Sequence, residues 1–328
     1  MFNEEIERTS DLRRAIMNPH YTLKQLKTFI EVAQHSSVSL AAEHVHVTQP
    51  AISMQLKQLE DSFGVSLFQP QGRNIELTPA GEDFYAYCLK VMATLKDLES
   101  VMSEHAGAKR GRINLAIVST AKYFTPKLLA AFNREFPDIH INLFIDNKET
   151  VFRELERSAV DMVISGRVPE HLNCTSLVFA DNPQSFVAHP AHPLAHQRAI
   201  SYNQLAKYPF VIREQGSGTR SAVEKLFAAH GVDLQVTMEF PSNEVIKQAV
   251  LADMGISFLS HRTMVKELKH GYLKTLDIEG EPYISEWQVA HLKTKKLSPA
   301  LTCFKQFLSQ QGQQLLDSDD LELLVGLK

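Results

Sequence analysis

Apolar positions in the first quarter of the chain recur at helical spacing and predict three helices. The first is indicated by apolar residues three or four positions apart: Leu23, Leu26, Phe29, Ile30 and Ala33. A short second helix follows with Ser36 or Ser37 as its N-cap. The third opens at Thr48, has a proline in its first turn and stops near Gly64. Residues 1–19 show no such period and are interpreted as an N-terminal extension.

The segment after the third helix predicts a β-hairpin and then a long helix. Two short strands, 66–68 and 75–77, flank the turn sequence PQGRN and form a wing. After Pro79, mostly apolar residues follow the a/d pattern of a coiled coil: Phe84, Cys88, Val91, Leu95, Leu98 and Met102. This seam predicts a dimer interface, with packing against its own domain as the alternative.

From residue 111 onward, strand-like and helix-like sequences alternate. The strand sequences INLAIVS, HINLFID and DMVISG are separated by amphipathic stretches, and the alternation recurs with PFVIRE and GISFLS before a last helix over 299–310. Strands separated by helices predict a parallel, doubly wound sheet. Two such lobes are needed to account for the length of this part of the chain.

Composition narrows the class of protein. A chain of 328 residues, 44% of them apolar, can bury more than one core. Its three cysteines, Cys88, Cys174 and Cys303, are too far apart for a metal knuckle and odd in number, which favours a reducing compartment. The sequence has no run of eighteen apolar residues and no signal-peptide pattern at its start. We therefore expect a cytoplasmic protein with no membrane partner.

Charge by itself does not indicate a nucleic-acid partner. The net charge is −4, and residues 20–80 are not basic, so a role in DNA binding depends on how residues are arranged. One such arrangement is the separation of Ala42 from Ile52 by ten positions. In a helix-turn-helix, a small residue and a β-branched residue at this separation allow the two helices to cross closely.

The stretch VTQPAISMQLKQLEDSFGVSLFQPQGRNIELTPAG resembles the DNA-binding domain of LysR-type regulators, and the resemblance extends from Tyr21 over almost all of the remaining chain. It implies a transcription factor that binds an inverted-repeat promoter site on double-stranded DNA as a homodimer or homotetramer, with RNA polymerase as a further candidate partner. It also implies an α/β chain with a periplasmic-binding-protein-like effector domain. The expected parts are an N-terminal extension (1–19), a winged helix-turn-helix (20–79), a dimerisation helix (80–110), effector lobe 1 (111–182 and 288–312), effector lobe 2 (183–287) and a tail (313–328).

The resemblance places the third helix in the major groove. Gln49 and Ser53 would then contact base edges, while Lys57 and Arg73 would pair with phosphates. The alternative for all of them is a solvated helix face or surface. The full set expected to bind DNA is Thr48, Gln49, Pro50, Ala51, Ser53, Gln55, Lys57 and Arg73. The sequence departs from the family pattern where charged residues are common, at Met54, Gln69 and Pro70, so we expect fewer phosphate contacts.

A second set of polar residues predicts an effector site. The strand INLAIVST ends at Thr120, and the helix after it would present free N–H groups to an anion. The end of the third strand and the loop QGSGTR would face the same crevice. The expected residues are Ser119, Thr120, Ala121, Lys122, Gly166, Arg167, Gly216, Ser217, Gly218 and Thr219. Simple helix capping and surface ion pairs are the alternatives.

Within the family, STAKYFTPKLLAAFNREFPDI and SGRVPE resemble the subgroup that regulates carbon-fixation (Rubisco) operons. That resemblance implies an anionic effector, with a phosphorylated metabolite and NADPH as candidates, and no cofactor. Regulators of nitrogen, sulfur or aromatic-acid metabolism share much of this scaffold and remain alternatives.

Two other classes of protein fit the sequence less well than a regulator. An α/β enzyme is disfavoured because GSGTRS has Ser221 where a dinucleotide fingerprint needs its third glycine, and because no nucleophile elbow or HExxH occurs. We expect no catalytic residues and no metal site, since His189, His192 and His196 alternate with prolines and cannot share a helix face. A solute-binding protein would share the lobes but would not need the winged helix.

Overall fold

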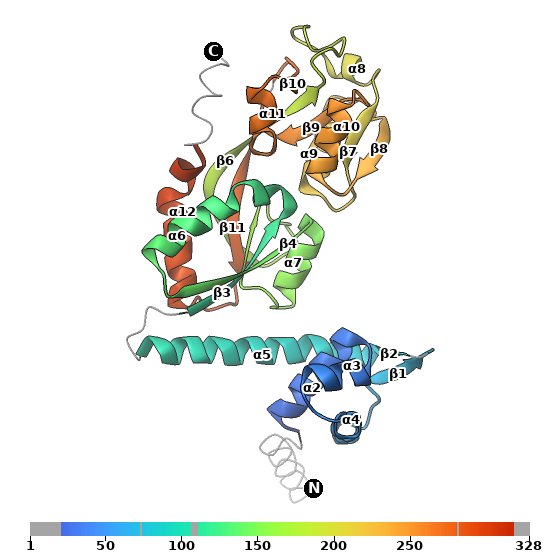
Figure 1. The fold of residues 1–328 in the computed structure, drawn as a ribbon, viewed down its shortest axis with the longest axis vertical. Helices are drawn as coiled ribbons and strands as arrows, with labels where there is room; N and C mark the ends of the chain where they lie inside the picture. The colour runs from blue at the N-terminus through green and yellow to red at the C-terminus, as the bar shows by residue number, and fades with distance from the viewer. Residues whose placement is uncertain (1–20, 73, 106–110, 281, 318–328) are drawn as a thin grey trace, which may run out of the picture. The chain divides into compact units, whose positions relative to one another are not determined.

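The computed structural model describes residues 21–72, 74–105, 111–280 and 282–317, and these form two units that meet within one long helix, between Lys96 and Asp97 (Figure 1). Each unit has its own hydrophobic core, and each is described by itself. Within the described ranges, no helix is both long and apolar enough to span a membrane.

The first unit consists of three helices, a hairpin and the start of the long helix: α2 (Leu23–His35), α3 (Val38–His44), α4 (Gln49–Phe63), β1 (Phe68–Gln71), β2 (Asn74–Leu77) and α5 (Pro79–His105). Thr22 caps α2 through a capping box with Gln25, and Ser37 caps α3. The expected helices and wing are therefore present. The strands differ slightly from expectation, because β1 continues through Pro70 and the turn between the strands is shorter.

Aromatic rings centred on Phe29 form the core of the first unit. The Phe29 ring lies 4.9 Å from that of Phe84 and 5.2 Å from that of Phe68, so α5 and the wing both pack on α2. Gly81 is needed at the start of α5 because a Cβ there would lie 2.0 Å from the carbonyl oxygen of Leu67. The wing, α2 and α5 are thus held as one body.

The structure divides the apolar seam of α5 between two environments. Phe84 packs on the core of the first unit and Cys88 is buried in it, which leaves Cys88 no surface to offer a partner helix. The expectation that Cys88 is an interface residue was therefore wrong, because the start of α5 is needed to close its own domain. Further along, Val91, Leu98 and Met102 are exposed.

The second unit is an α/β domain that contains these elements in chain order: β3 (Gly111–Val118), η1 (Ser119–Tyr123), α6 (Thr125–Glu135), β4 (Ile139–Asp146), α7 (Lys148–Glu156), β5 (Met162–Ser165), β6 (Cys174–Ala188), α8 (Tyr202–Leu205), β7 (Phe210–Arg213), α9 (Gly218–Ala229), β8 (Val236–Phe240), α10 (Asn243–Leu251), β9 (Ser257–Ser260), η2 (His261–Thr263), α11 (Val265–Lys269), β10 (Lys274–Thr275), β11 (Tyr283–Leu292) and α12 (Pro299–Asp317).

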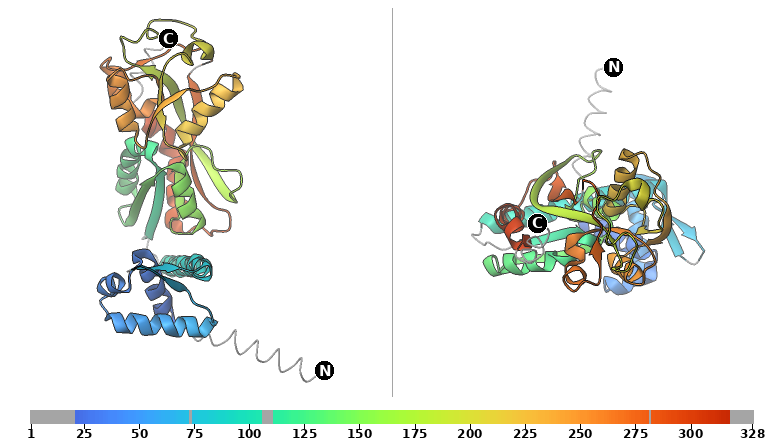
Figure 2. Two further views of the ribbon diagram at one scale, coloured as in Figure 1. Left: turned by 90° about the vertical axis from the view of Figure 1, so that its right-hand side faces the viewer. Right: turned by 90° about the horizontal axis from the view of Figure 1, so that it is seen from above.

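The main sheet has the strand order β10-β6-β11-β5-β3-β4, with β9 also paired to β6. Strand β3 is parallel to β4 and β5, as expected for a wound sheet, but β11 is antiparallel to both β5 and β6. The sheet is therefore mixed, and within it the expected parallel arrangement holds for β3, β4 and β5 but not for the pairs formed by β11. The reason is that β6 and β11 are long strands that run from one lobe to the other, and Figure 2 shows them joining the lobes.

Each lobe has a separate core on its own side of these crossing strands. In lobe 1, helices α6 and α12 pack together (Figure 1) around Phe132, whose ring lies 5.0 Å from that of Phe304. In lobe 2, strands β7 and β8 form a parallel pair, and the buried rings of Phe186, Phe210 and Phe227 lie at the centre. The polar space between the lobes is therefore flanked by two separate hydrophobic cores.

The last helix is longer than expected. It continues to Asp317, and Leu316 near its end is buried in lobe 1. Gly312 lies so close to β6 that a Cβ there would be 2.6 Å from the ring of Phe179. A tail beginning at residue 313 was therefore wrong for residues 313–317, which pack on the domain; residues 318–328 lie outside the described part.

Candidate functional site

Helix α4 presents the residues expected to read DNA on its outward face. Ile52, Leu56 and Leu59 are buried against the first unit, and the opposite face is open. Thr48, Gln49, Pro50, Ser53 and Lys57 are exposed there, while Ala51 and Gln55 are half-buried. The Thr48 hydroxyl makes no capping hydrogen bond within the chain, which leaves it available to an external acceptor. Arg73 lies outside the described residues.

Two hydrogen bonds from neighbouring helices orient glutamines of α4. The Ser39 hydroxyl of α3 donates to Gln49 Oε1 at 3.1 Å, so the amide NH₂ of Gln49 remains for another partner. The Thr28 hydroxyl of α2 donates to Gln55 Oε1 at 2.7 Å. Gln55 thus links α4 to α2. Its half-buried position suits this structural role better than contact with bases.

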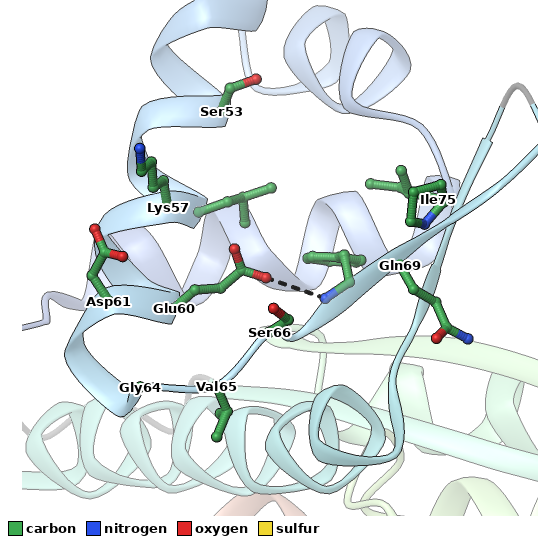
Figure 3. Close-up of a pocket in the computed structure, with 12 residues that line it drawn as sticks. Ser53, Lys57, Glu60, Asp61, Gly64, Val65, Ser66, Gln69 and Ile75 are labelled. Atoms are coloured by element: carbon green, nitrogen blue, oxygen red, sulfur yellow. Dashed lines mark hydrogen bonds between the residues drawn. The ribbon is translucent and has the colours of Figure 1, made fainter.

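A groove of about 730 Å³ separates α4 from the wing (Figure 3). Ser53 and Lys57 line its helix side and Gln69 its wing side. Glu60 accepts hydrogen bonds from the backbone N–H groups of residues 67 and 68, at 2.7 and 3.3 Å, and so fixes the wing to the helix. Asp61 adds a second carboxylate at this end, and two acids there disfavour a DNA phosphate. Contact with DNA is therefore expected towards Ser53, away from the acids.

A second cavity, of about 170 Å³, lies between the two lobes of the second unit. Its walls come from the corner between β3 and η1, the start of α7, the loop after β5, the start of α9, and the crossing strands β6 and β11. Seven residues expected at an effector site line it: Ser119, Thr120, Gly166, Arg167, Ser217, Gly218 and Thr219.

Three expected effector residues do not line this cavity. Ala121 is fully buried in the lobe 1 core, and the Lys122 ammonium lies 5.3 Å over the ring of Tyr123. Gly216 faces Glu149 instead, where a Cβ would be 2.8 Å from the carboxylate. Ala121 and Lys122 lie outside the cavity because the chain after β3 forms a short 3₁₀ turn, and α6 starts only at Thr125.

Much of the wall was not foreseen from the sequence. The additional residues come from seven separate segments: Val118, Asn147, Lys148, Ser165, Asn182, Gln184, Arg213, Ser221, Ala222, Lys225, Tyr283, Ser285 and Trp287. One of them had a usable signal, since Arg213 belongs to the apolar strand sequence PFVIRE and an arginine is almost never fully buried unless it is paired. The residues of β6 and β11 had no signal, because those strands were not expected.

Arg213 connects the lobes across the cavity. Its side chain is 2% exposed and pairs with Glu214 through two hydrogen bonds of 2.7 and 2.8 Å. It also donates to Ser119 Oγ of lobe 1 at 2.9 Å and to Asn243 Oδ1 of lobe 2 at 2.9 Å. Asn243 Nδ2 in turn donates to Thr120 Oγ1 at 3.2 Å. The corner after β3 is thus tied to lobe 2 by buried polar contacts.

The cavity wall carries a strong excess of positive charge. Four cationic side chains line it, those of Lys148, Arg167, Arg213 and Lys225, and the described lining residues include no carboxylate. Arg167 is exposed and pairs with Glu170 at 2.5 Å. Burial lowers the pKa of the Lys148 ammonium, and the charges of Lys225 and Arg167 lower it further. A bound anion would relieve this repulsion.

Three lining residues also hold a buried polar atom without a hydrogen-bond partner among the described residues: Ser165 Oγ, Gln184 Oε1 and Trp287 Nε1. Each such atom costs about 1–3 kcal/mol of desolvation. Unpaired polar groups gathered at one place indicate a site that a polar ligand or ordered water completes.

Comparison with known proteins identifies the family. The chain matches the family models "Bacterial regulatory helix-turn-helix protein, lysR family" over residues 23–82 and "LysR substrate binding domain" over residues 106–313. The chain belongs to the LysR family of bacterial regulators. It is thus a transcriptional regulator rather than an enzyme or a solute-binding protein, and the winged helix-turn-helix with an effector domain expected from the sequence is confirmed.

Three relatives are informative. A RuBisCO operon transcriptional regulator from Allochromatium vinosum is 39% identical over 90% of this chain and 98% of its own. The regulatory domain of CcmR from Synechocystis PCC6803, solved in complex with 2-PG, is 40% identical, with a TM-score of 0.59 over 61% of this chain and 97% of its own. Full-length CbnR, solved with its target DNA, is 21% identical, with a TM-score of 0.66 over 88% of this chain and 99% of its own, and shows the shared fold.

Proposed function

We propose that this LysR-type regulator controls a carbon-fixation operon and that a small phosphorylated acid, 2-phosphoglycolate or a close analogue, is the effector bound between its lobes. The observation that carries the proposal is the charge of the cavity, whose described wall has four cationic side chains and no carboxylate. Arg167 and Arg213 also pair with acids outside the wall, so Lys148 and Lys225 supply most of the excess positive charge. Such a wall attracts a dianion and rejects a neutral solute. The likeness to the 2-PG complex of CcmR supports the same choice of ligand.

The size of the cavity favours a compact ligand. Its volume of about 170 Å³ is below the ~300–1,000 Å³ of pockets that hold drug-sized molecules. A two-carbon phosphorylated acid suits such a space, whereas NADPH would require the lobes to separate and break the contacts of Arg213 and Asn243 that bridge them. Of the two effector classes expected from the sequence, the structure therefore favours the phosphorylated metabolite.

DNA binding is proposed to use the outward face of α4. Gln49 and Ser53 would contact base edges, Lys57 and Arg73 would contact phosphates, and the protein would act in the cytoplasm as a homodimer or homotetramer on an inverted-repeat promoter site, with RNA polymerase as a further partner. The support for this is the exposed polar face of α4 and the fold shared with CbnR, which was solved with its target DNA. A regulator of this kind needs no cofactor.

Calorimetric titration of the full-length protein with 2-phosphoglycolate tests the effector site. We expect Thr120→Val to lower the affinity at least about tenfold, because the hydroxyl at the cavity wall is lost while the shape is kept, and a hydrogen bond to a charged group contributes about 1.5–3 kcal/mol. Thr120→Val also removes the hydrogen bond from Asn243, but Arg213 still bridges the lobes through Ser119. Binding of the ligand-free protein to DNA from upstream of its own gene should therefore not change.

Lys122→Ala is the matched control, since this cation lies near Thr120 in sequence but outside the cavity, and it should bind the ligand as tightly as the parent. Glycolate, which lacks the phosphate, should bind much more weakly than 2-phosphoglycolate. If Thr120→Val left the affinity unchanged, the effector site would have to lie elsewhere. Tighter binding of NADPH than of 2-phosphoglycolate would overturn the argument from size.

A further inference from the structure

Three side chains that can act as metal ligands converge on the surface of the first unit, and none of them belongs to the two sets of residues described above. Glu31 and His35 are four residues apart on α2 and so share a face of the helix, while His44 is the last residue of α3. His44 Nδ1 lies 2.8 Å from Glu31 Oε2, and His35 Nε2 lies 3.7 Å from the same oxygen. The three donor atoms all lie within 4.8 Å of one another.

These separations suit a single transition-metal ion. Zinc binds imidazole nitrogen and carboxylate oxygen at about 2.0–2.2 Å in tetrahedral geometry, which places the donors about 3.3 Å from one another. The two measured separations, 2.8 and 3.7 Å, lie on either side of that value. The two imidazole nitrogens also lie within 4.8 Å of each other, so small changes in side-chain torsion angles would bring the three donors to the tetrahedral spacing.

We propose that Glu31, His35 and His44 form an exchangeable Zn²⁺ site that links α2 to α3. Two imidazoles and one carboxylate are a donor set used by zinc sites that keep an open position, whereas closed structural sites add thiolates or a fourth protein ligand. Water would fill the remaining position. On binding, the metal replaces the hydrogen that the imidazole and the carboxylate share, and that proton passes to solvent.

The approach of both histidines to one carboxylate oxygen distinguishes this cluster from an ordinary surface contact. A hydrogen bond from His44 to Glu31 accounts for one short distance, but it does not require a second imidazole at the same oxygen. The rings of His35 and His44 lie 5.1 Å apart, between centroids. The side chains of Glu31, His35 and His44 are 25%, 35% and 63% exposed, so an ion can reach the cluster from solvent.

Zinc bound here would act on the helix that precedes the DNA-reading helix. His44 ends α3 only four residues before Thr48, the N-cap of α4. Helix α3 also holds Gln49 in place through Ser39. An ion that fastens the end of α3 to α2 therefore reduces the freedom of the turn that positions the first residues of α4. Metal occupancy becomes a second input to DNA binding, independent of the effector cavity.

Zinc titration of the untagged full-length protein against a competing chromophoric chelator tests the proposal. We expect one high-affinity Zn²⁺ per chain. His35→Gln and His44→Gln should each lower the affinity at least tenfold, because removing even an outer-shell partner of a metal site lowers affinity about 10–100-fold. Hydrogen exchange measured by mass spectrometry should show slower exchange over residues 38–44 when zinc is present, in the parent but not in His44→Gln.

His46→Asn is the control for histidine content. His46 lies in the same turn but outside the cluster, and its positive φ of 55° is one that asparagine adopts readily. This variant should bind zinc as the parent does. Equal zinc affinity in the parent and in His44→Gln would overturn the proposal, as would slower exchange that appears away from α2 and α3. Neither result would bear on the effector cavity, which lies in the other unit.

Discussion

Gln49 and Lys57 are both exposed on α4, about two turns apart. Their side chains would present different chemical groups to DNA. The amide of Gln49 is held at its oxygen by Ser39, so its NH₂ group points to a partner with fixed orientation. The Lys57 ammonium is a flexible point charge on an exposed stem. A fixed amide can read the edge of a base, whereas a mobile charge responds only to phosphate.

We therefore expect Gln49→Ala to weaken binding to the specific site by roughly 1–3 kcal/mol and to leave binding to random DNA nearly unchanged. Lys57→Ala should weaken both, and it should reduce the slope of log affinity against log salt by about one unit, since one phosphate contact is lost. Fluorescence anisotropy on specific and random duplexes at several salt concentrations measures both effects. Equal losses on the two duplexes for Gln49→Ala would show that this helix does not read bases at Gln49.

At the scale of elements, α5 serves two purposes along its length. Its start closes the core of the first unit through Phe84 and Cys88. Beyond that, Val91, Leu98 and Met102 are exposed and continue the seam, and Leu95 between them is half-buried. A helix that exposes an apolar stripe at a/d spacing is stabilised by pairing with a second copy. We therefore propose that the dimer interface predicted from the sequence is formed only by the later part of α5, from Val91 to Met102.

Leu98→Lys combined with Met102→Lys should dissociate this interface, because burying each of these side chains contributes about 1.5–3 kcal/mol and a buried lysine opposes pairing. If the full-length protein is a tetramer built from two kinds of dimer, light scattering should show its mass halved. Thr94→Lys, an exposed polar position of the same helix, is the control and should keep the parent mass. An unchanged mass in the double variant would contradict the coiled-coil interpretation.

At the scale of the whole molecule, the second unit is held together by buried polar contacts between its lobes and crossing strands. His261 in η2 is one of them, and its Nε2 lies 2.8 Å from Ser185 Oγ of β6. Burial lowers the pKa of His261 to about 4, and the charge of Arg262 contributes to this shift. The imidazole is therefore neutral in the folded protein at pH values where the unfolded chain begins to take up a proton.

Because the unfolded state binds the extra proton, we expect the second unit to be most stable above pH 6.5 and to lose stability as the pH falls from 6.5 towards about 4. The loss attributable to His261 is at most about 3.4 kcal/mol, because each pKa unit of the shift corresponds to about 1.36 kcal/mol. His261→Gln, which can keep a hydrogen bond to Ser185, should show a flatter dependence of melting temperature on pH. His140→Gln, at an exposed position, should follow the parent; identical pH profiles for all three proteins would contradict this assignment.

The lobes of the second unit also set the limits of regulation. Arg213 and Asn243 already bridge them at the edge of the cavity. A ligand can therefore shift the equilibrium between two lobe arrangements only by as much as its binding free energies for the two differ. Such differences are typically about 1–3 kcal/mol. A difference of this size would change promoter occupancy several-fold, so the proposed effector site could control DNA binding despite its small volume.

The sequence by itself determined the features that depend on neighbours along the chain. The periods of α2 and α4, the caps at Thr22 and Ser37, and the wing all follow from residues within a few positions of one another, because helix and turn energies are local. The family resemblance carried the assignment to LysR-type regulators. Seven of the ten expected effector residues reached the cavity because strand ends and loops of a wound sheet converge at one edge.

Only the tertiary structure decided which distant residues meet. The antiparallel pairing of β6 with β11 joins residues more than a hundred positions apart, as in Ala180 with Trp287, and no local period signals such a pair. The same holds for Arg213 at Ser119 and for His44 at Glu31. The a/d spacing of Cys88 would also allow it to face a partner helix. In the structure it fills the space between α5 and the core of its own unit instead. Long-range packing chooses among faces that local spacing leaves equivalent.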